Sequence, residues 1–307
     1  MADDLWKLVN IPSPTCKERE VALIFAKMLT DAGVQVEVDE TIYQSPSVVG
    51  RLQGKRPGKT LQLAGHLDHI GVDHSEPHRK DNIISGRGAA DMKNGLAGIL
   101  EIVRVLNENG CNFTGEILIT VYGRHEAPDG DSKSLQNLIE KGIKGHAAIV
   151  LEGPSDAAMI MAKGQSIWQI TLKRQGPTCH ELIAPSDCGD LLGAVLPLTE
   201  ALRQKNSELF DRQHNYPLLG PESLFIGQMH YGDFYNRLPN KCTLQGTWRW
   251  LPNHSFEQIQ DEFSELIQSV NCPQGVTLEH SWIFVGESYE ISADEPVVQS
   301  LIKSYGF

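Results

Sequence analysis

The order of apolar and polar positions divides the chain into two parts with different predicted folds. In the first part, short apolar runs alternate with segments that carry apolar residues at helical spacing. Helices are predicted at residues 18–33, 94–110 and 134–142, and strands at residues 34–38, 47–52, 60–65, 116–122 and 146–151. This alternation predicts an α/β domain of three layers, with a sheet packed between helices.

From about Gln165 onwards the pattern changes. The predicted elements are strand 167–173, helix 187–204, strands 223–229 and 242–250, helix 256–270 and strand 276–284. This β-α-β-β-α-β order is typical of a ferredoxin-like domain. One more amphipathic helix, residues 295–306, has no obvious partner in the small domain, which favours an insertion. We therefore predict a first domain of residues 1–164 and 288–307, interrupted by a domain of residues 165–287.

Composition restricts the class of protein. The 307 residues, 40% of them apolar, can supply two ordinary cores. A formal net charge of −12 would repel a phosphate backbone and argues against nucleic-acid binding. No apolar run approaches membrane-spanning length, and the start lacks the basic and apolar regions of a signal peptide. The six cysteines are scattered without a CxxC pair, so we expect a reducing cytoplasm and neither a disulfide framework nor a thiolate zinc site.

The first candidate for chemistry is the end of the predicted strand 60–65. The small pair Ala64-Gly65 leaves room for a ligand, and His66 and Asp68 follow it. Residues two apart on an extended backbone point to the same side. Asp68 could then accept the far ring N–H of a metal-bound His66 and so fix its tautomer and orientation. The alternative is a polar strand end on the surface.

The second candidate is the glycine-rich segment of residues 85–95. Gly86-x-Gly88 resembles the start of a dinucleotide fingerprint, but Asp91 occupies the third glycine position. A carboxylate there would repel a pyrophosphate, so we reject dinucleotide binding. Asp91 lies just ahead of a predicted helix, where it could be an N-cap or a carboxylate that bridges two metals.

Two further apolar runs end in acidic residues. Glu126 follows the predicted strand 116–122 in the sequence GRHEAP, and Glu152 follows the strand 146–151. Ligands gather at the carboxyl ends of strands in α/β sheets. A histidine and several carboxylates converging at such ends suit zinc, cobalt or manganese.

The ordered set GHLD, GRGAADMK, a glutamate-pair position and EGP resembles the co-catalytic zinc amidohydrolases. That family includes acetylornithine deacetylase, succinyl-diaminopimelate desuccinylase, glutamate carboxypeptidases and aminoacylases. The start LVNIPSPTCKERE is similar to the family's N-terminal motif, and GPTCHELIAP and NRLPNKCTLQGTWRW are similar to motifs of its small domain. The resemblance covers essentially the whole chain. It implies a zinc-peptidase-like catalytic domain with an inserted lid and dimerisation domain.

The resemblance also implies a role for each matching residue. His66 and Glu152 would bind one metal, Asp91 would bridge two, and Glu126 would bind the second, with Asp68 orienting His66. In the small domain, the implied roles are oxyanion stabilisation across a homodimer by His180 and substrate recognition by Asn236 and Arg249. Two zinc ions, or cobalt or manganese, would activate water for hydrolysis of an amide bond in a small N-acyl amino acid or peptide.

The sequence departs from the family pattern at two places. Where the family has Glu-Glu, with a general base followed by a ligand, this chain has His125-Glu126. His125 could be the base, an extra ligand or an inactivating change, and breaks at Gly123 and Pro128 must re-aim one of the pair if both face the metals. The chain also ends at Phe307, before the family's final histidine ligand. We therefore expect the C-terminal part of the catalytic domain to be missing, in either a fragment or a naturally short product.

These departures leave three hypotheses. The first is an active metallo-amidohydrolase, and the second is a non-catalytic homologue that keeps the fold and binds or dimerises. The third is an α/β protein without metal. The sequence does not say which acyl amino acid or peptide would be the substrate.

Overall fold

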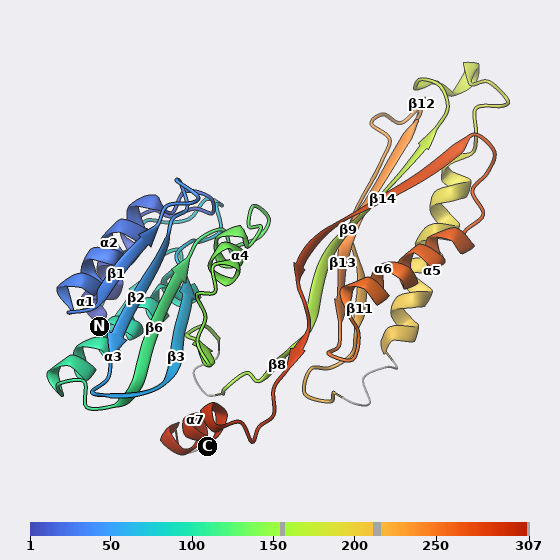
Figure 1. The fold of residues 1–307 in the computed structure, drawn as a ribbon. Helices are drawn as coiled ribbons and strands as arrows, with labels where there is room; N and C mark the ends of the chain where they lie inside the picture. Colours follow the sequence, from blue (N-terminus) through green and yellow to red (C-terminus); the bar gives the residue numbers. More distant parts are fainter. Residues whose placement is uncertain (154–156, 211–215, 306–307) are drawn as a thin grey trace. The chain divides into compact units, whose positions relative to one another are not determined.

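The computed structural model describes residues 1–153, 157–210 and 216–305. The chain forms two compact units, Met1–Ala157 and Ala158–Phe307, which we call unit 1 and unit 2 (Figure 1). Each unit has its own apolar core. The change of pattern near Gln165 in the sequence therefore coincides closely with the boundary between the two units.

A five-stranded sheet forms the centre of unit 1, in the order β1-β2-β6-β3-β7. Its strands are β1 (Gln35–Asp39), β2 (Ser47–Gln53), β3 (Arg56–His66), β6 (Thr114–Tyr122) and β7 (Ala147–Val150). β3 is parallel to both β6 and β7, whereas β2 pairs with β1 and β6 in antiparallel register. The carboxyl ends of β3, β6 and β7 consequently meet at one edge of the sheet.

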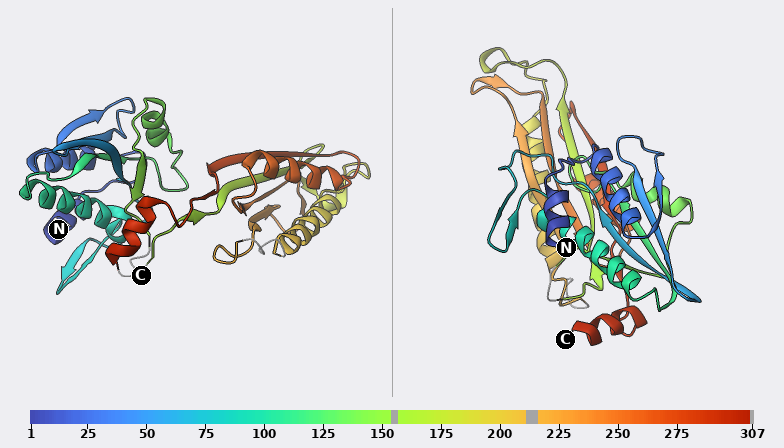
Figure 2. Two further views of the ribbon diagram at one scale, coloured as in Figure 1. Left: turned by 60° about the horizontal axis from the view of Figure 1, so that its bottom comes forward. Right: turned by 90° about the vertical axis from the view of Figure 1, so that its left-hand side faces the viewer.

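Helices cover both faces of this sheet, as the alternating pattern predicts. The helices of unit 1 are α1 (Ala2–Val9), α2 (Arg19–Asp31), α3 (Asn94–Glu108) and α4 (Lys133–Glu140). Apolar residues of α2 and α3, among them Phe25 and Ile99, are fully buried in the main core. On the other face, Leu138 of α4 packs with Val49 and Leu118 of the sheet. The three-layer α/β arrangement is therefore present in unit 1 (Figure 2).

Unit 2 contains a four-stranded antiparallel sheet in the order β11-β13-β9-β14. Its main elements are β9 (Gly164–Arg174), α5 (Leu191–Phe210), β11 (Ser223–Tyr231), β13 (Lys241–Trp250), α6 (Phe256–Ser269) and β14 (Val276–Gly286). The predicted β-α-β-β-α-β order is thus observed, and both helices cover the same face of the sheet (Figure 1). The core between these helices and the sheet includes the buried indoles of Trp168, Trp248 and Trp250.

Several short elements were not predicted. They are α1, the hairpin of β4 (His78–Lys80) and β5 (Ile83–Ser85), a π-helical turn η1 (Ala89–Lys93), β8 (Met161–Ala162), β10 (Cys179–His180), a 3₁₀ turn η2 (Glu181–Ile183), β12 (Arg237–Leu238) and β15 (Tyr289–Glu290). The helix predicted at residues 295–306 is α7 (Pro296–Tyr305), and Gly306 lies outside the described residues. Among the described residues, no helix has the length and apolarity needed to span a bilayer.

An ion pair between the buried Asp39 and the partly exposed Lys141 joins the sheet of unit 1 to the end of α4, and it predicts acid sensitivity. Asp39 accepts hydrogen bonds from Lys141 Nζ, from Asn137 Nδ2 at 3.0 Å and from the Thr41 backbone N–H at 3.0 Å. Burial alone would raise the pKa of Asp39, but the hydrogen bonds from Lys141 and Thr41 outweigh it and lower the pKa to about 2. Because the ordinary value is 3.8, the interaction stabilises the folded state by about 2 kcal/mol above pH 5.

That stabilisation should be lost as the pH falls from about 4 to about 2, since the carboxylate then becomes protonated in both states. Asp39→Asn should cost about 2 kcal/mol at pH 7 and almost nothing near pH 2. Hydrogen exchange of the β1 and β2 amides would measure this difference. The exposed Asp31, paired only with Lys27, supplies the control variant Asp31→Asn. A penalty for Asp39→Asn that stays constant with pH would contradict the linkage.

Candidate metal centre

The end of β3 places His66 at the edge where the parallel strands meet. Gly65 lies close against the segment after Asp91, because an added Cβ would lie 2.6 Å from Met92 Cε and 3.0 Å from Leu96 Cδ2. His66 follows with 1% of its side chain exposed, and its backbone N–H contacts Met92 Sδ at 3.1 Å. The space beside Gly65 is therefore filled by the protein's own Met92 and Leu96, and not by the ligand that the sequence suggested.

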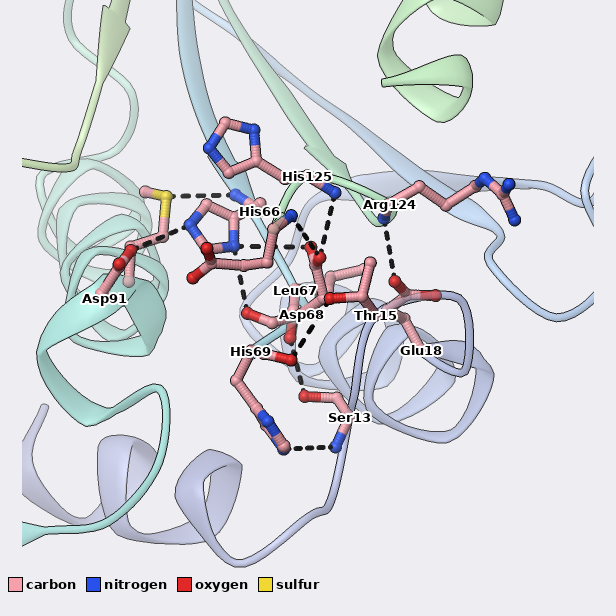
Figure 3. A network of polar contacts seen from close by, with 12 residues as sticks. Ser13, Thr15, Glu18, His66, Leu67, Asp68, His69, Asp91, Arg124 and His125 are labelled. Atoms are coloured by element: carbon pink, nitrogen blue, oxygen red, sulfur yellow. Dashed lines mark hydrogen bonds and ion pairs between the residues drawn. The ribbon is translucent and has the colours of Figure 1, made fainter. Parts of the chain in front are cut away.

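Asp68 is fully buried and contacts both His66 and the segment that follows β6 (Figure 3). His66 Nδ1 lies 3.1 Å from the Asp68 backbone oxygen and 3.5 Å from its carboxylate Oδ1. The other carboxylate oxygen, Oδ2, accepts the backbone N–H groups of His125 at 2.9 Å and Glu126 at 2.8 Å. The backbone carbonyl of Asp68 therefore lies within hydrogen-bonding distance of the His66 ring. The Asp68 carboxylate binds the backbone of residues 125 and 126, just after β6.

A second buried carboxylate, that of Glu18, binds the backbone of Arg124, the residue before His125. Glu18 Oε1 accepts the Arg124 backbone N–H at 2.9 Å and the Cys16 N–H at 2.8 Å, and Oε2 accepts the Ser45 hydroxyl. Three successive N–H groups, those of residues 124–126, therefore donate to two buried carboxylates. This pattern fixes the direction of the chain immediately after β6.

The break that re-aims this segment occurs at Arg124. Arg124 has a left-handed backbone with φ of 62°, while its guanidinium forms two 2.7 Å hydrogen bonds to Asp131. Gly123, expected to supply the break, does not have a positive φ among the described backbone angles. Its hydrogen side chain instead leaves room for Glu18, because an added Cβ would lie 2.6 Å from Glu18 Cδ. The sequence expectation for Gly123 was wrong in its physical reason.

Asp91 faces the site rather than capping the following helix. It lies in η1 with a side chain 57% exposed, and its Oδ1 is 3.1 Å from His66 Nε2. The cap position of α3 is Lys93, and no side chain accepts a capping hydrogen bond there. The N-cap alternative for Asp91 is therefore not realised.

Glu126, Glu152 and His125 complete the cluster. Ligand atoms of His66, Asp91 and Glu126 lie within 4.8 Å of one another, and so do those of His66, His125 and Glu152. α3 approaches the end of β7 closely, since a Cβ on Gly95 would lie 2.2 Å from the Leu151 oxygen. Glu152, the next residue, is thereby brought beside His66, with 3.9 Å between Oε2 and Nε2. Every metal-binding residue expected in unit 1 thus belongs to one cluster.

Crowding of charge shifts the proton affinity of these side chains. Burial raises the pKa of Glu126 to about 7, and the neighbouring Asp91 carboxylate adds to the rise. Burial lowers the pKa of His125, and the adjacent His66 acts in the same direction. For His66, burial opposes the charged form, but the hydrogen bond with Asp68 and the nearby carboxylates outweigh it and raise the pKa. A shared cation would relieve this repulsion among carboxylates.

The donor set fits a divalent metal of the zinc class. Imidazole nitrogens and carboxylate oxygens are the ligands of catalytic zinc sites and also suit cobalt and manganese. His66 presents Nε2 to the cluster while Nδ1 lies against Asp68, the arrangement in which an outer hydrogen bond orients a metal-bound imidazole. Residues 64–68, 91, 125, 126 and 152 therefore provide both ligands and their support.

One cavity beside this cluster contains a residue that sequence reasoning missed. The cavity has a volume of about 330 Å³, and Asp91, Glu126, His69, His74 and Arg87 are among its lining residues. Arg87 has its Nε buried without a hydrogen-bond partner, and no ion pair of Arg87 occurs in the described part of the chain. A basic residue between two glycines, four positions before Asp91, was the available signal.

Glu18 was also missed as a supporting residue, although it lies within the quoted N-terminal motif. Its carboxylate is fully buried, and burial raises its pKa. A glutamate in the charged stretch Lys17–Glu20, at the start of an amphipathic helix, looks like a solvated residue, so the folded position of residues 123–124 identifies its role.

The expected substrate residues of unit 2 fall in two places. His180 and Asn236 lie in contact, with 3.1 Å between Nε2 and Nδ2, next to the paired strands β10 and β12. Arg249 is exposed on β13, opposite Gln165 and Ser223 of the neighbouring strands. Unit 2 thus brings His180 and Asn236 together, and Arg249 belongs to the main sheet.

Comparison with known proteins agrees with this site. The model of Peptidase family M20/M25/M40 matches residues 62–306. The acetylornithine deacetylase of Aliivibrio fischeri strain MJ11 is 27% identical over 92% of this chain and 74% of its own length. The aminopeptidase PepT structure from Bacillus cereus has a TM-score of 0.75 at 19% identity, covering 100% of this chain and 83% of that one.

A second solved structure has a similar fold. The YXEP protein of Bacillus subtilis, described as a dinuclear metal binding peptidase from the M20 family, has a TM-score of 0.68 at 14% identity, covering 99% of this chain and 78% of that one. The family model spans most of the chain and includes every expected ligand. The chain therefore belongs to Peptidase family M20/M25/M40 and is an enzyme of its metallopeptidase and deacylase class.

Proposed function

We propose that the chain hydrolyses the amide bond of a small N-acyl amino acid or short peptide that carries a free carboxylate. The observation that carries the proposal is the convergence of His66, Asp91, Glu126 and Glu152 at the joined carboxyl ends of β3, β6 and β7. Zinc is the expected metal, with two ions expected as in the dinuclear relative, and cobalt or manganese as substitutes.

A bound metal supplies a Lewis acid for the scissile carbonyl and lowers the pKa of water. The chain's own residues do the remaining work. Asp68 orients His66, His125 and Glu126 through its contacts with the His66 ring and with the backbone N–H groups of the other two residues. A proton leaving water needs an acceptor that can later return it to the amine, and His125 and Glu126 are the two side chains at the site able to do so.

Arg87 supports a substrate with a carboxylate. An arginine fork matches a carboxylate in two parallel hydrogen bonds, and the Arg87 guanidinium has no carboxylate partner among the described residues. Its cavity also contains Asp91 and Glu126, so an anionic group held there would lie beside the hydrolytic residues. Arg87 thus offers a carboxylate anchor within unit 1 itself.

Arg87→Gln should raise KM for N-acetyl amino acids by roughly 10- to 100-fold, because a hydrogen bond to a charged group contributes about 1.5–3 kcal/mol. The same substitution should change turnover of the matching amino-acid amides little, since they lack the carboxylate. Steady-state kinetics with the two substrate series would measure the contrast. Arg79→Gln, which removes a surface arginine paired with Asp3, is the control. Equal losses on both series would contradict the anchor.

Residues 165–287, which lie within unit 2, are proposed as an inserted lid and dimerisation domain. Support comes from the strands that flank it: β8 and β15 pair in antiparallel register, so the chain enters and leaves the domain side by side. His180 and Asn236 would then act on substrate bound by the partner protomer, and Arg249 would bind its carboxylate. Sedimentation of the purified protein as a homodimer is the expected result, and a monomer would remove these roles in trans.

Hydrolysis of a panel of N-acyl amino acids and dipeptides tests the function. Protein freed of metal should be inactive, and zinc or cobalt should restore cleavage together with two bound ions per chain. The alternative of a non-catalytic homologue requires one ion or none and no cleavage of any member of the panel. The substrate that is cleaved fastest would also define the acyl group.

A further inference from the structure

We propose that His125 is a metal ligand, and that His66, His125 and Glu152 form a site of two histidines and one glutamate. The inference rests on the proposed metal-dependent function and concerns the residue that differs from the family's glutamate pair. It assigns His125 a role in holding the ion rather than in accepting a proton.

Distances within the three residues carry the assignment. Glu152 Oε2 lies 3.9 Å from His66 Nε2 and 4.0 Å from His125 Nε2. Both separations exceed hydrogen-bonding length, and Glu152 forms no hydrogen bond within the described residues. Ligands about 2.0–2.1 Å from a tetrahedral ion are roughly 3.3 Å apart, so the three atoms need to approach by less than about 1 Å along these two separations.

The direction of His125 is built into the fold. Its ring stacks on that of His66, with 4.4 Å between centroids and 22° between planes. The backbone N–H of His125 donates to the buried Asp68 carboxylate, and the left-handed turn at Arg124 sets the residue's approach. These interactions hold His125 beside His66, so that both Nε2 atoms lie within 4.0 Å of Glu152 Oε2.

His66 Nε2 is common to both candidate ligand sets, and one nitrogen lone pair binds one ion. An ion held by His66, His125 and Glu152 has the ligand types of a catalytic zinc site with an open position. Asp91 and Glu126, the other members of the second set, then remain as carboxylates next to this ion. Glu126 becomes the proton acceptor of the reaction, and Asp91 is free to contact the same ion or a second one.

Metal binding, measured without substrate, tests the assignment. In metal-free protein, His125→Asn should weaken zinc binding by about 100-fold in calorimetry, at the upper limit of what loss of an outer partner costs. X-ray absorption of the zinc-loaded protein should fall from two coordinated imidazoles to one. His78→Asn, which removes an exposed histidine of the same unit, should change neither quantity.

Nitrogen NMR of the wild-type protein removes any dependence on how the variant folds. Zinc should shift the Nε2 resonances of both His66 and His125. Unchanged zinc affinity and one coordinated imidazole in the wild type would overturn the ligand role of His125 while leaving the hydrolase function intact. A wild-type protein that binds no zinc at all would instead overturn the proposed function together with this inference.

Discussion

Asp91→Ala should reduce hydrolysis by roughly 10³-fold or more and lower the number of bound metal ions. Its Oδ1 lies 3.1 Å from His66 Nε2, and its side chain belongs to a candidate ligand set with Glu126. Loss of metal stabilisation worth several kcal/mol in the transition state accounts for a rate effect of that size. Steady-state kinetics and metal analysis of the dialysed protein would measure the two losses.

Stability separates this effect from a folding defect. The Asp91 side chain is 57% exposed and makes no helix cap, so Asp91→Ala should leave the melting temperature of the metal-free protein almost unchanged. Glu108→Ala removes an exposed carboxylate at the other end of α3 and is the matched control. An Asp91→Ala protein with full metal content and normal kcat would show that the cluster around His66 is not the hydrolytic site.

Asp68→Ala should have the second largest effect, on both stability and metal binding. Its Oδ2 accepts the backbone N–H groups of His125 and Glu126, which are left without an acceptor in the alanine variant. Each unsatisfied buried group costs about 1–3 kcal/mol, so we expect a loss of roughly 3 kcal/mol in the free energy of unfolding of unit 1. Metal affinity should fall by about 10- to 100-fold, because His66 and the chain after β6 lose their common support.

Asp68→Asn separates the two contributions. The amide oxygen can still accept from His125 and Glu126, so the stability loss should be smaller than for alanine. Its Nδ2 would donate toward His66 Nδ1, favouring the tautomer that protonates Nε2 and cannot bind metal. Zinc calorimetry and urea unfolding of the two variants would distinguish them. Wild-type zinc affinity in Asp68→Asn would contradict an orienting role for the carboxylate.

The regular elements could be predicted because their patterns are local and long. β3, β6 and β9 have nine or more residues and each contains a run of buried apolar positions, and α3 carries its buried residues on one face. Elements such as β8 and β15 have two residues each and exist through pairing across 127 positions of sequence, from Ala162 to Tyr289. No local pattern encodes such a pair. The helix α1 was missed for another reason, since its apolar residues do have amphipathic spacing.

The residues of the site were predicted by another route. Their identity at strand ends, together with the resemblance of ordered motifs, indicated His66, Asp91, Glu126 and Glu152 before any contact was known. Arg87 escaped this reasoning because an arginine between two glycines has no characteristic spacing, and its unpaired guanidinium is visible only beside the cavity. The domain boundaries at 164 and 288 and the homodimer remain predictions.

By itself, the sequence determined the main strands and helices of the two sheets and the chemical types of residue that follow β3, β6 and β7. Those features depend on side-chain periodicity and on composition, which are properties of neighbouring residues. Only the tertiary structure decided that His125 and Glu126, adjacent on the chain, both face His66. The physical reason is that the left-handed Arg124 and two buried carboxylates, Glu18 and Asp68, fix three successive N–H groups, and those acceptors come from distant parts of the chain.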